Sequence, residues 1–174
     1  MDYLTKPVSR KELREYAIVF RKLFGIPLSG KVPVMDVLER FHLIFPGSFF
    51  SIAEDTDLPA TIPARCNVLI NGKFEIEIRQ TTYDGAFKNI GAYRDHIIHE
   101  ICHAFLYTLG YTPILQRSFK NGELVRYMSS EWQAEALCGE VMIPFEETKL
   151  LSSDEIAKEY GVSIAQAKFR TRLP

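Results

Sequence analysis

Residues 94–105 read RDHIIHEICHAF, and this stretch carries the strongest chemical signal in the sequence. His99 and His103 stand four positions apart, which on an α-helix places both imidazoles on one face, one turn from each other. Glu100 follows His99 and lies about 100° further round the helix, beside the point where the imidazoles meet. The pattern HExxH is typical of a catalytic zinc site in which the glutamate is the general base. An amphipathic helix that happens to carry two histidines is the alternative.

A catalytic zinc ion needs a third protein ligand. No histidine follows His103 in the chain, so the ligand has to be a carboxylate. Glu131 and Glu135 stand four apart in the apolar stretch EWQAEALCGEVMI, residues 131–143, and we expect both on a buried helical stripe. We predict Glu131 as the third ligand and Glu135 as the acceptor that orients a ligand histidine through its second ring nitrogen. The alternative is that both acids are solvated in the first turn of their helix.

Capping and turn signals around these motifs predict the remaining helices. Ser9 with Glu12 forms a capping box for a core helix that ends at Gly25, and Ser130 with Gln133 is expected to cap the helix that carries Glu131. The other helices are expected from Pro33 to the residue before Pro46, over residues 92–109, and as two short helices broken at Gly161, of which the second opens at Ser163. Asn121-Gly122 belongs to the connection between the two motif helices.

The strands are expected between these helices. Residues 66–79, CNVLINGKFEIEIR, form two runs around Asn71-Gly72, the pair that favours a type I′ hairpin turn. Alternation of apolar and charged residues from Phe74 to Arg79 predicts a half-exposed antiparallel sheet. Residues 46–65 are expected to be loop and irregular strand, and residues 81–91, TTYDGAFKNIG, a loop.

Composition limits the classes of protein to consider. The chain has 174 residues, a formal net charge of -1 and 47% hydrophobic residues, which fits a single globular domain without the charge expected of a nucleic-acid-binding surface. No signal peptide or membrane-spanning stretch is expected, so we predict a cytoplasmic protein. Cys66, Cys102 and Cys138 lack CxxC spacing and are expected to be reduced thiols.

The two motifs together resemble the ImmA/IrrE family of zinc metallo-endopeptidases. HEICHAFLY followed by EWQAEALCGEVMIP is similar to the family's HEIGH and E-x-x-A-N-x-F-A-x-x-L-L-M-P, and TTYDGAF and the N-terminal helix are also similar. The resemblance implies His99, His103 and Glu131 as ligands of one zinc ion and Glu100 as the catalytic glutamate. Three positions depart from the family pattern: Cys102 replaces a glycine, Glu135 an Asn or Asp, and Cys138 an alanine.

The resemblance also implies a fold and a substrate class. The expected fold is a small α+β, zincin-like core, with an antiparallel sheet packed on the active-site helix and a sheet edge that can receive an extended peptide. We expect residues 1–148 to form the metallopeptidase domain, and residues 149–174 a tail resembling half of a helix-turn-helix, packed on the same domain. The implied substrate is a helix-turn-helix repressor or an antitoxin of a mobile-element, stress-response or toxin–antitoxin system.

Several functional assignments remain open at the level of sequence. Oxyanion stabilisation is assigned to no single residue, and the candidates are Tyr83 and Tyr107, with Arg94 and His96 behind them. Lys168, Arg170 and Arg172 near the end of the tail are more typical of a helix C-terminus than of a DNA contact, so we do not expect direct DNA binding. The alternative to an enzyme is a regulatory interaction protein that keeps the zinc site and cleaves nothing. Neither a membrane partner nor a particular oligomeric state is indicated, and manganese or iron could also fit two histidines and a carboxylate.

Overall fold

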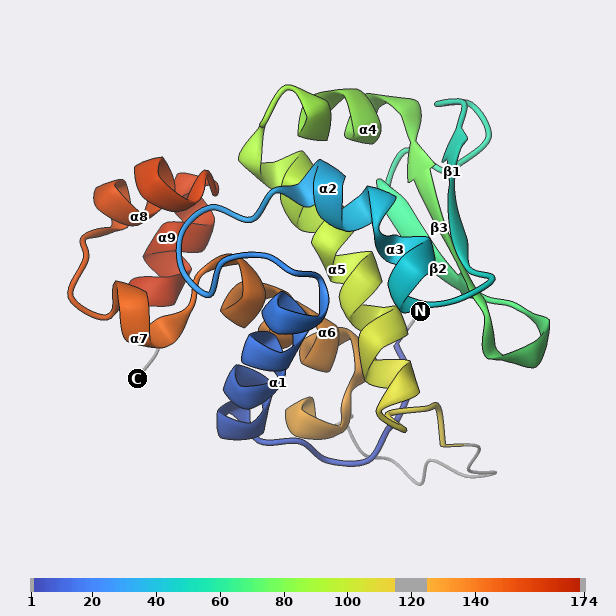
Figure 1. Cartoon of the computed structure of the whole chain (residues 1–174), viewed down its shortest axis with the longest axis horizontal. Helices are drawn as coiled ribbons and strands as arrows, with labels where there is room; N and C mark the ends of the chain where they lie inside the picture. The colour runs from blue at the N-terminus through green and yellow to red at the C-terminus, as the bar shows by residue number, and fades with distance from the viewer. Residues whose placement is uncertain (1, 115–124, 173–174) are drawn as a thin grey trace.

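The structure is a computed structural model, and it describes residues 2–114 and 125–172. This part of the chain has an α+β fold in which helices cover one face of a three-stranded sheet that lies at the side of the molecule (Figure 1). Its helices are α1 (Arg10–Leu23), α2 (Val34–Glu39), α3 (Phe41–Ile44), α4 (Gln80–Phe87), α5 (Gly91–Thr108), α6 (Ser130–Met142), α7 (Phe145–Thr148), α8 (Ser153–Tyr160) and α9 (Ile164–Thr171). Its strands are β1 (Phe49–Ala53), β2 (Ala64–Val68) and β3 (Phe74–Arg79). Asn121 and Gly122 lie outside the described residues.

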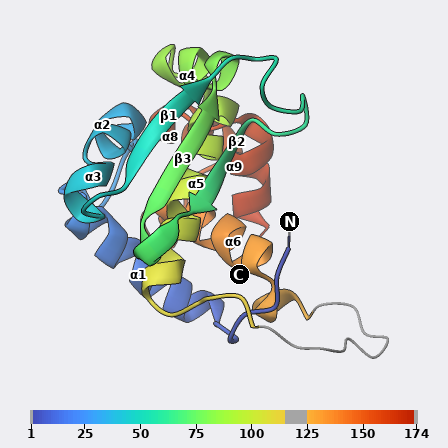
Figure 2. The same ribbon diagram turned by 90° about the vertical axis from the view of Figure 1, so that its right-hand side faces the viewer.

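The sheet is mixed, with the strand order β1-β3-β2. β2 and β3 form the expected antiparallel hairpin, with Val68 opposite Phe74, but β1 runs parallel to β3, so the prediction of an antiparallel sheet is only partly right. The reason is the connection over residues 54–63, which carries the chain from one edge of the sheet to the other (Figure 2). Arg79 holds this connection by donating to the carbonyl oxygens of Leu58 and Pro59.

Side chains on β3 alternate between the core and solvent, as predicted. Phe74, Ile76 and Ile78 are buried, whereas Glu75 and Glu77 face the outer side and accept hydrogen bonds from residues of the neighbouring strands. Asn71 and Gly72 both have positive φ, as a type I′ turn requires, but the hairpin loop spans three residues, Ile70–Gly72. One face of the sheet is therefore available to pack on helices.

α5 lies in the middle of the molecule and contacts the sheet on one side and α6 on another (Figure 1). Its apolar residues Ile97, Ile98, Ile101 and Phe105 are buried in the core. Burial on several sides fixes the helix, so the residues on its remaining face are held in a defined orientation.

Three details of the helices differ from expectation. Residues 80–87 form α4 rather than a loop, and the helix predicted from Pro33 is interrupted at Arg40, which separates α2 from α3. The N-cap of α6 is Ser129 instead of Ser130, and its hydroxyl accepts from the backbone N–H of Trp132. The capping boxes predicted at Ser9 and Ser163 are both confirmed.

The last two helices, α8 and α9, meet at Gly161, which adopts a positive φ of 62°. Arg170 of α9 is buried and forms a two-pronged ion pair with the buried Glu140 of α6, with N–O distances of 2.9 and 3.0 Å. Arg10 and Arg14 of α1 also contact Glu140. This cluster connects the tail with α1 and α6 and leaves Arg170 engaged inside the protein.

Candidate metal centre

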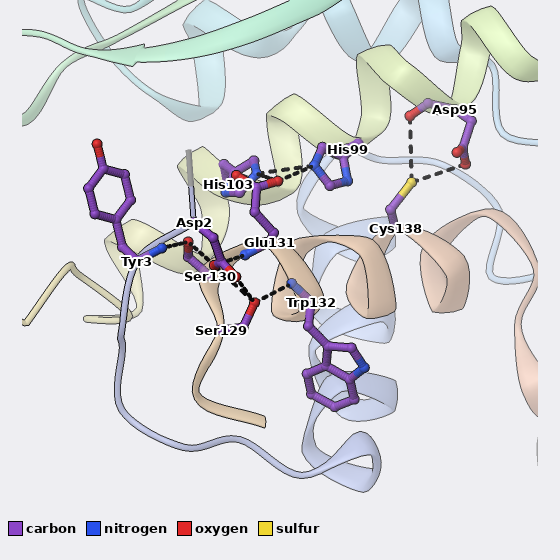
Figure 3. A network of polar contacts seen from close by, with 10 residues as sticks. All are labelled: Asp2, Tyr3, Asp95, His99, His103, Ser129, Ser130, Glu131, Trp132 and Cys138. Carbon is purple, nitrogen blue, oxygen red and sulfur yellow. Dashed lines mark hydrogen bonds and ion pairs between the residues drawn. The ribbon is translucent and has the colours of Figure 1, made fainter. Parts of the chain in front are cut away.

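The two histidines of the HExxH motif lie on α5 and direct their rings toward the start of α6 (Figure 3). The Nε2 atoms of His99 and His103 are 3.1 Å apart, and each side chain is 22% exposed. The spacing of four residues brings the rings together, and the buried isoleucines on the other faces of α5 keep this pair turned away from the core.

Glu131 reaches the same point from the first turn of α6 (Figure 3). Its Oε2 atom lies 3.5 Å from Nε2 of His99 and 3.6 Å from Nε2 of His103. The structure thus brings together the three residues that the sequence pairs from separate motifs, and their ligand atoms could hold a metal ion.

The dimensions of this triangle fit zinc. Zinc takes His nitrogen and carboxylate oxygen at about 2.0–2.2 Å in tetrahedral geometry, which separates ligand atoms by about 3.3–3.5 Å. The three observed separations of 3.1, 3.5 and 3.6 Å lie around that value. Three protein ligands of this kind leave the fourth tetrahedral position open, as catalytic zinc sites do.

The charges in the triangle are strongly coupled. Hydrogen bonds with His103 and His99 hold the pKa of Glu131 well below its usual range, against the opposing effect of burial. Burial acts to lower the pKa of His99, but the hydrogen bond to Glu131 and the negative charges of Glu100, Glu131 and Asp95 outweigh it, so that this pKa is raised. A site that holds one carboxylate against two imidazoles in this way attracts a cation.

Glu100 lies beside the triangle but is not part of it. Burial raises the pKa of Glu100, although the neighbouring His99 and His103 oppose the rise. A backbone hydrogen bond from Cys66 on β2 also acts to lower the pKa of Glu100. A carboxylate with a raised pKa next to an open metal position is suited to accept a proton and release it again.

A cleft of about 640 Å³ gives access to these residues. One wall is formed by residues 61–68, which include all of β2, and the other contains Glu100, His103, Tyr107 and Glu131. β2 is an edge strand, paired with β3 on one side only, so its other side can offer backbone hydrogen bonds. The cleft can therefore accommodate an extended chain across the triangle.

The other site residues predicted from the sequence lie in different parts of the structure, and one of them lines the cleft. Tyr107 lines the cleft, whereas Tyr83 stacks on Phe50 with a ring-centroid distance of 6.4 Å and is not among the residues lining the cleft. Arg94 is buried and donates to the carbonyl oxygens of Val32 and Tyr160, which is a structural role. His96 lines a separate depression near Thr81 and Tyr93.

Glu135 is not on a buried stripe, and that expectation is wrong. The residue is exposed, and within residues 2–114 and 125–172 no hydrogen bond joins it to His99 or His103. The reason is the angular position of Glu135, which is rotated about 40° from Glu131 toward the solvent side of α6. The buried acid on α6 is Glu140, which sequence reasoning did not single out.

Sequence reasoning also missed Asp95 and Asp2. Asp95 lies one turn before His99, contributes to the raised pKa of that histidine, and accepts from the Cys138 thiol at 3.3 Å. Asp2 accepts from the hydroxyls of Ser129 and Ser130 and from the backbone N–H of Glu131, so it holds the turn that presents Glu131 (Figure 3). Only the i, i+4 spacing of Asp95 and His99 was visible in the sequence; the position of Asp2, 129 residues before Glu131, carries no such signal.

The triad and the fold together define a class. An α+β fold with HExxH on its central helix and a glutamate from the next long helix fits the zincin motif. No protein-family model matches the chain, and no curated protein matches its sequence.

The chain is similar in structure to a transcriptional regulator of Mycobacterium tuberculosis, with a TM-score of 0.54 and 13% sequence identity. The similarity covers 92% of this chain and 46% of that one, so this chain spans less than half the length of the regulator. At this identity the likeness concerns the fold alone.

No helix in the described parts of the chain has both the length and the apolar character that crossing a membrane requires.

Proposed function

We propose that this protein is a zinc-dependent endopeptidase of the ImmA/IrrE type, which hydrolyses a peptide bond in a specific protein substrate. The observation that supports this most directly is the triangle of His99, His103 and Glu131 with Glu100 beside it in an accessible cleft. A zinc site that served structure alone would need no general base and would have four protein ligands.

The roles of the side chains follow from their positions. A zinc ion held by the three ligands would polarise a substrate carbonyl and lower the pKa of a water molecule. Glu100 accepts a proton from that water as its oxygen bonds to the carbonyl carbon, and then donates the proton to the nitrogen as the C–N bond breaks. Tyr107 is the oxyanion candidate that lines the cleft.

The substrate class proposed here rests on the resemblance to the family, which implies a helix-turn-helix repressor or an antitoxin. The edge of β2 supports an extended segment as the form in which the substrate binds, because an unpaired edge adds a strand through backbone hydrogen bonds. We also propose that the protein binds one zinc ion per chain and acts in the cytoplasm.

A library of denatured-proteome peptides, digested with zinc-loaded protein and read by mass spectrometry, tests the catalytic role. The wild type should cleave a restricted set of peptides, and Glu100→Gln should lower the rate by about 100-fold or more while it still binds zinc. Glu147→Gln, on the exposed surface of α7, is the matched control and should cleave as the wild type does. Equal rates for wild type and Glu100→Gln would refute the role of Glu100.

A non-catalytic, zinc-containing regulatory protein is the second candidate. Its support is the structural likeness to a transcriptional regulator. This candidate predicts that the zinc-loaded wild type cleaves neither the peptide library nor intact helix-turn-helix proteins.

A further inference from the structure

The outer face of α1 carries apolar side chains that the fold itself does not use. α1 packs on α6 and lies at one side of the molecule (Figure 2), and its residues Leu13, Ala17 and Phe20 are buried in the core. On the opposite face, Ile18 and Val19 are 47% and 49% exposed. Both are β-branched, and such residues are weak helix formers whose apolar surface stabilises a protein only when it is removed from water. This pair therefore indicates a contact with another molecule.

Opposite charges stand on the two sides of this apolar pair. Glu15 lies one turn before the pair and Lys22 one turn after it, and both are exposed. Positions 15, 18, 19 and 22 are related by steps of three and four residues, which on an α-helix places their side chains along one line. These four residues form the outer stripe of α1. Along the stripe the charge changes from negative to positive, with apolar surface in the middle.

The outer stripe of α1 is complementary to a reversed copy of itself. In a two-fold dimer the two copies of α1 run antiparallel, and each residue faces the one that is equally far from the centre on the partner. With the centre between Ile18 and Val19, Glu15 of each copy lies opposite Lys22 of the other, while the apolar pairs meet between these contacts. A stripe with one sign of charge would repel its own copy. The order of the charges therefore favours a second copy of this chain as the partner.

We propose that two copies of this chain form a dimer in which their α1 helices pack antiparallel through the outer stripe: Glu15, Ile18, Val19 and Lys22. Leu23, which is 48% exposed, extends the apolar contact toward the end of the helix. None of these residues lines the cleft along β2, so the interface is separate from the candidate metal centre. The inference does not depend on the proposed peptidase function.

The size of α1 sets the strength expected of this dimer. The helix has 14 residues and is therefore about 21 Å long. One helix from each copy gives an interface smaller than the roughly 1,000 Å² that a stable complex buries. We therefore expect monomer and dimer to exchange, with a dissociation constant on the order of 10–100 μM.

Sedimentation of the full chain over about 1–500 μM measures the association. The mass of the wild type should rise from one chain toward two across this range. Val19→Asp places a charge from each copy at the centre of the interface and should weaken the association by about tenfold or more. Leu150→Asp is the matched control, because Leu150 is 92% exposed in the connection between α7 and α8 and its replacement should leave the association unchanged.

Reversal of single charges tests the antiparallel pairing. Glu15→Lys brings a lysine opposite Lys22 at both ends of the interface, and Lys22→Glu brings a glutamate opposite Glu15 at both ends. Each variant alone should associate about fivefold or more weakly than the wild type, because two attractive contacts become repulsive. An equal mixture of the two variants should associate as the wild type does, because every lysine of one variant then faces a glutamate of the other.

A wild type that stays monomeric up to about 500 μM would overturn the dimer. If Val19→Asp associates as the wild type does, the interface lies elsewhere and the proposal is wrong. Circular dichroism checks that each variant is folded. Should Val19→Asp fail to fold, the two charge reversals still decide the question, because both change exposed residues. Single variants that associate normally, or a mixture that associates no better than they do, would contradict the antiparallel pairing.

Discussion

His99 is the residue at which protons and a metal ion compete most directly. Its pKa is raised, chiefly because Glu131 and the neighbouring acids outweigh the effect of burial. An imidazole must lose its proton before it binds metal, so protonation below this pKa opposes zinc and deprotonation above it favours zinc. We expect the apparent zinc affinity to rise across the pH range in which this raised pKa is passed, and then to level off. Competition with a chelator across this range measures the effect, and a flat profile would contradict the ligand role of His99.

The three cysteines differ in burial: Cys102 and Cys138 are buried, whereas Cys66 is half-buried in the wall of the cleft. Burial and the charge of Glu100 raise the pKa of Cys66 to about 12. The contact with Cys102, together with burial and Asp95, raises the pKa of Cys138 well above its usual value. Because the thiolate is the reactive form, the folded protein should resist iodoacetamide at neutral pH, whereas the unfolded chain should react at all three positions. Rapid alkylation of the folded chain, seen as an increase in mass, would show that these thiols are accessible.

For single residues, the sequence predicts the relative positions of side chains wherever these depend only on spacing along one helix. His99, His103 and Glu100 share one helix, so a shift of one residue in the helix ends does not change their relation. The position of Glu135 depended on how α6 is rotated against α5, which packing decides and spacing does not. Asp2 approaches Glu131 only through tertiary structure, and for that reason no local pattern indicated it.

Among the elements, the first turn of α6 depends on the N-terminal segment. Asp2 accepts from the Glu131 backbone N–H at 3.2 Å, and Leu4 pairs with Ser129 in an antiparallel bridge. Loss of such an outer contact typically costs a metal site about 10- to 100-fold in affinity. We therefore expect Asp2→Ala to lower the zinc affinity by roughly tenfold.

The control for this prediction is Glu159→Ala, which removes an exposed acid on α8 and should leave zinc affinity as it is. Titration with a fluorescent zinc indicator compares the two variants. Equal affinities of Asp2→Ala and wild type would mean that α6 holds Glu131 without help from Asp2.

The attachment of α9 depends on Glu140. This carboxylate is 1% exposed and neutralises the buried Arg170, with Arg10 and Arg14 also in contact. Glu140→Gln leaves the shape but removes the charge, and an unpaired buried charge of this kind destabilises a protein by about 3 kcal/mol or more. Urea unfolding measures the change in the free energy of unfolding. The exposed Glu147→Gln should change it by less than about 0.5 kcal/mol, and a similarly small change for Glu140→Gln would contradict the prediction.

Elements with strong local signals were predictable, and those defined by long-range pairing were not. The capping box of Ser9 and Glu12 predicts the start of α1, and the structure confirms it. The parallel direction of β1 depends on a connection of residues 54–63, whose path has no periodic signal. The composition of residues 81–91, with Asp84 and Gly85, predicts a loop where the structure has α4. Gly85 lies where a Cβ would come within 2.1 Å of the ring of Tyr93. Close packing of α4 on α5 therefore accounts for that glycine.

Over the whole molecule, the sheet and the helices hold α5 and α6 in a fixed relation, and this relation brings the triangle together. The three-stranded sheet covers one side of α5, while α1 and α9 support α6 through Glu140 and the surrounding core. The α+β class could be predicted because strand and helix periodicities are both present in the sequence. The sequence predicts the approach of Glu131 to the two histidines because a catalytic zinc ion needs a third protein ligand. The structure brings these three residues together.

The central claim is that three side chains from two helices hold one metal ion while Glu100 stays outside the ligand set. Its most direct test is metal content by mass spectrometry on wild type, Glu131→Ala and Glu100→Gln, each purified without added metal and then supplied with zinc, with the exposed Glu135→Ala as the control. We predict about one zinc per chain in wild type, Glu100→Gln and Glu135→Ala, and a loss of zinc in Glu131→Ala. A wild type that binds no zinc even when it is supplied, or a Glu131→Ala variant that binds it as the wild type does, would contradict the account.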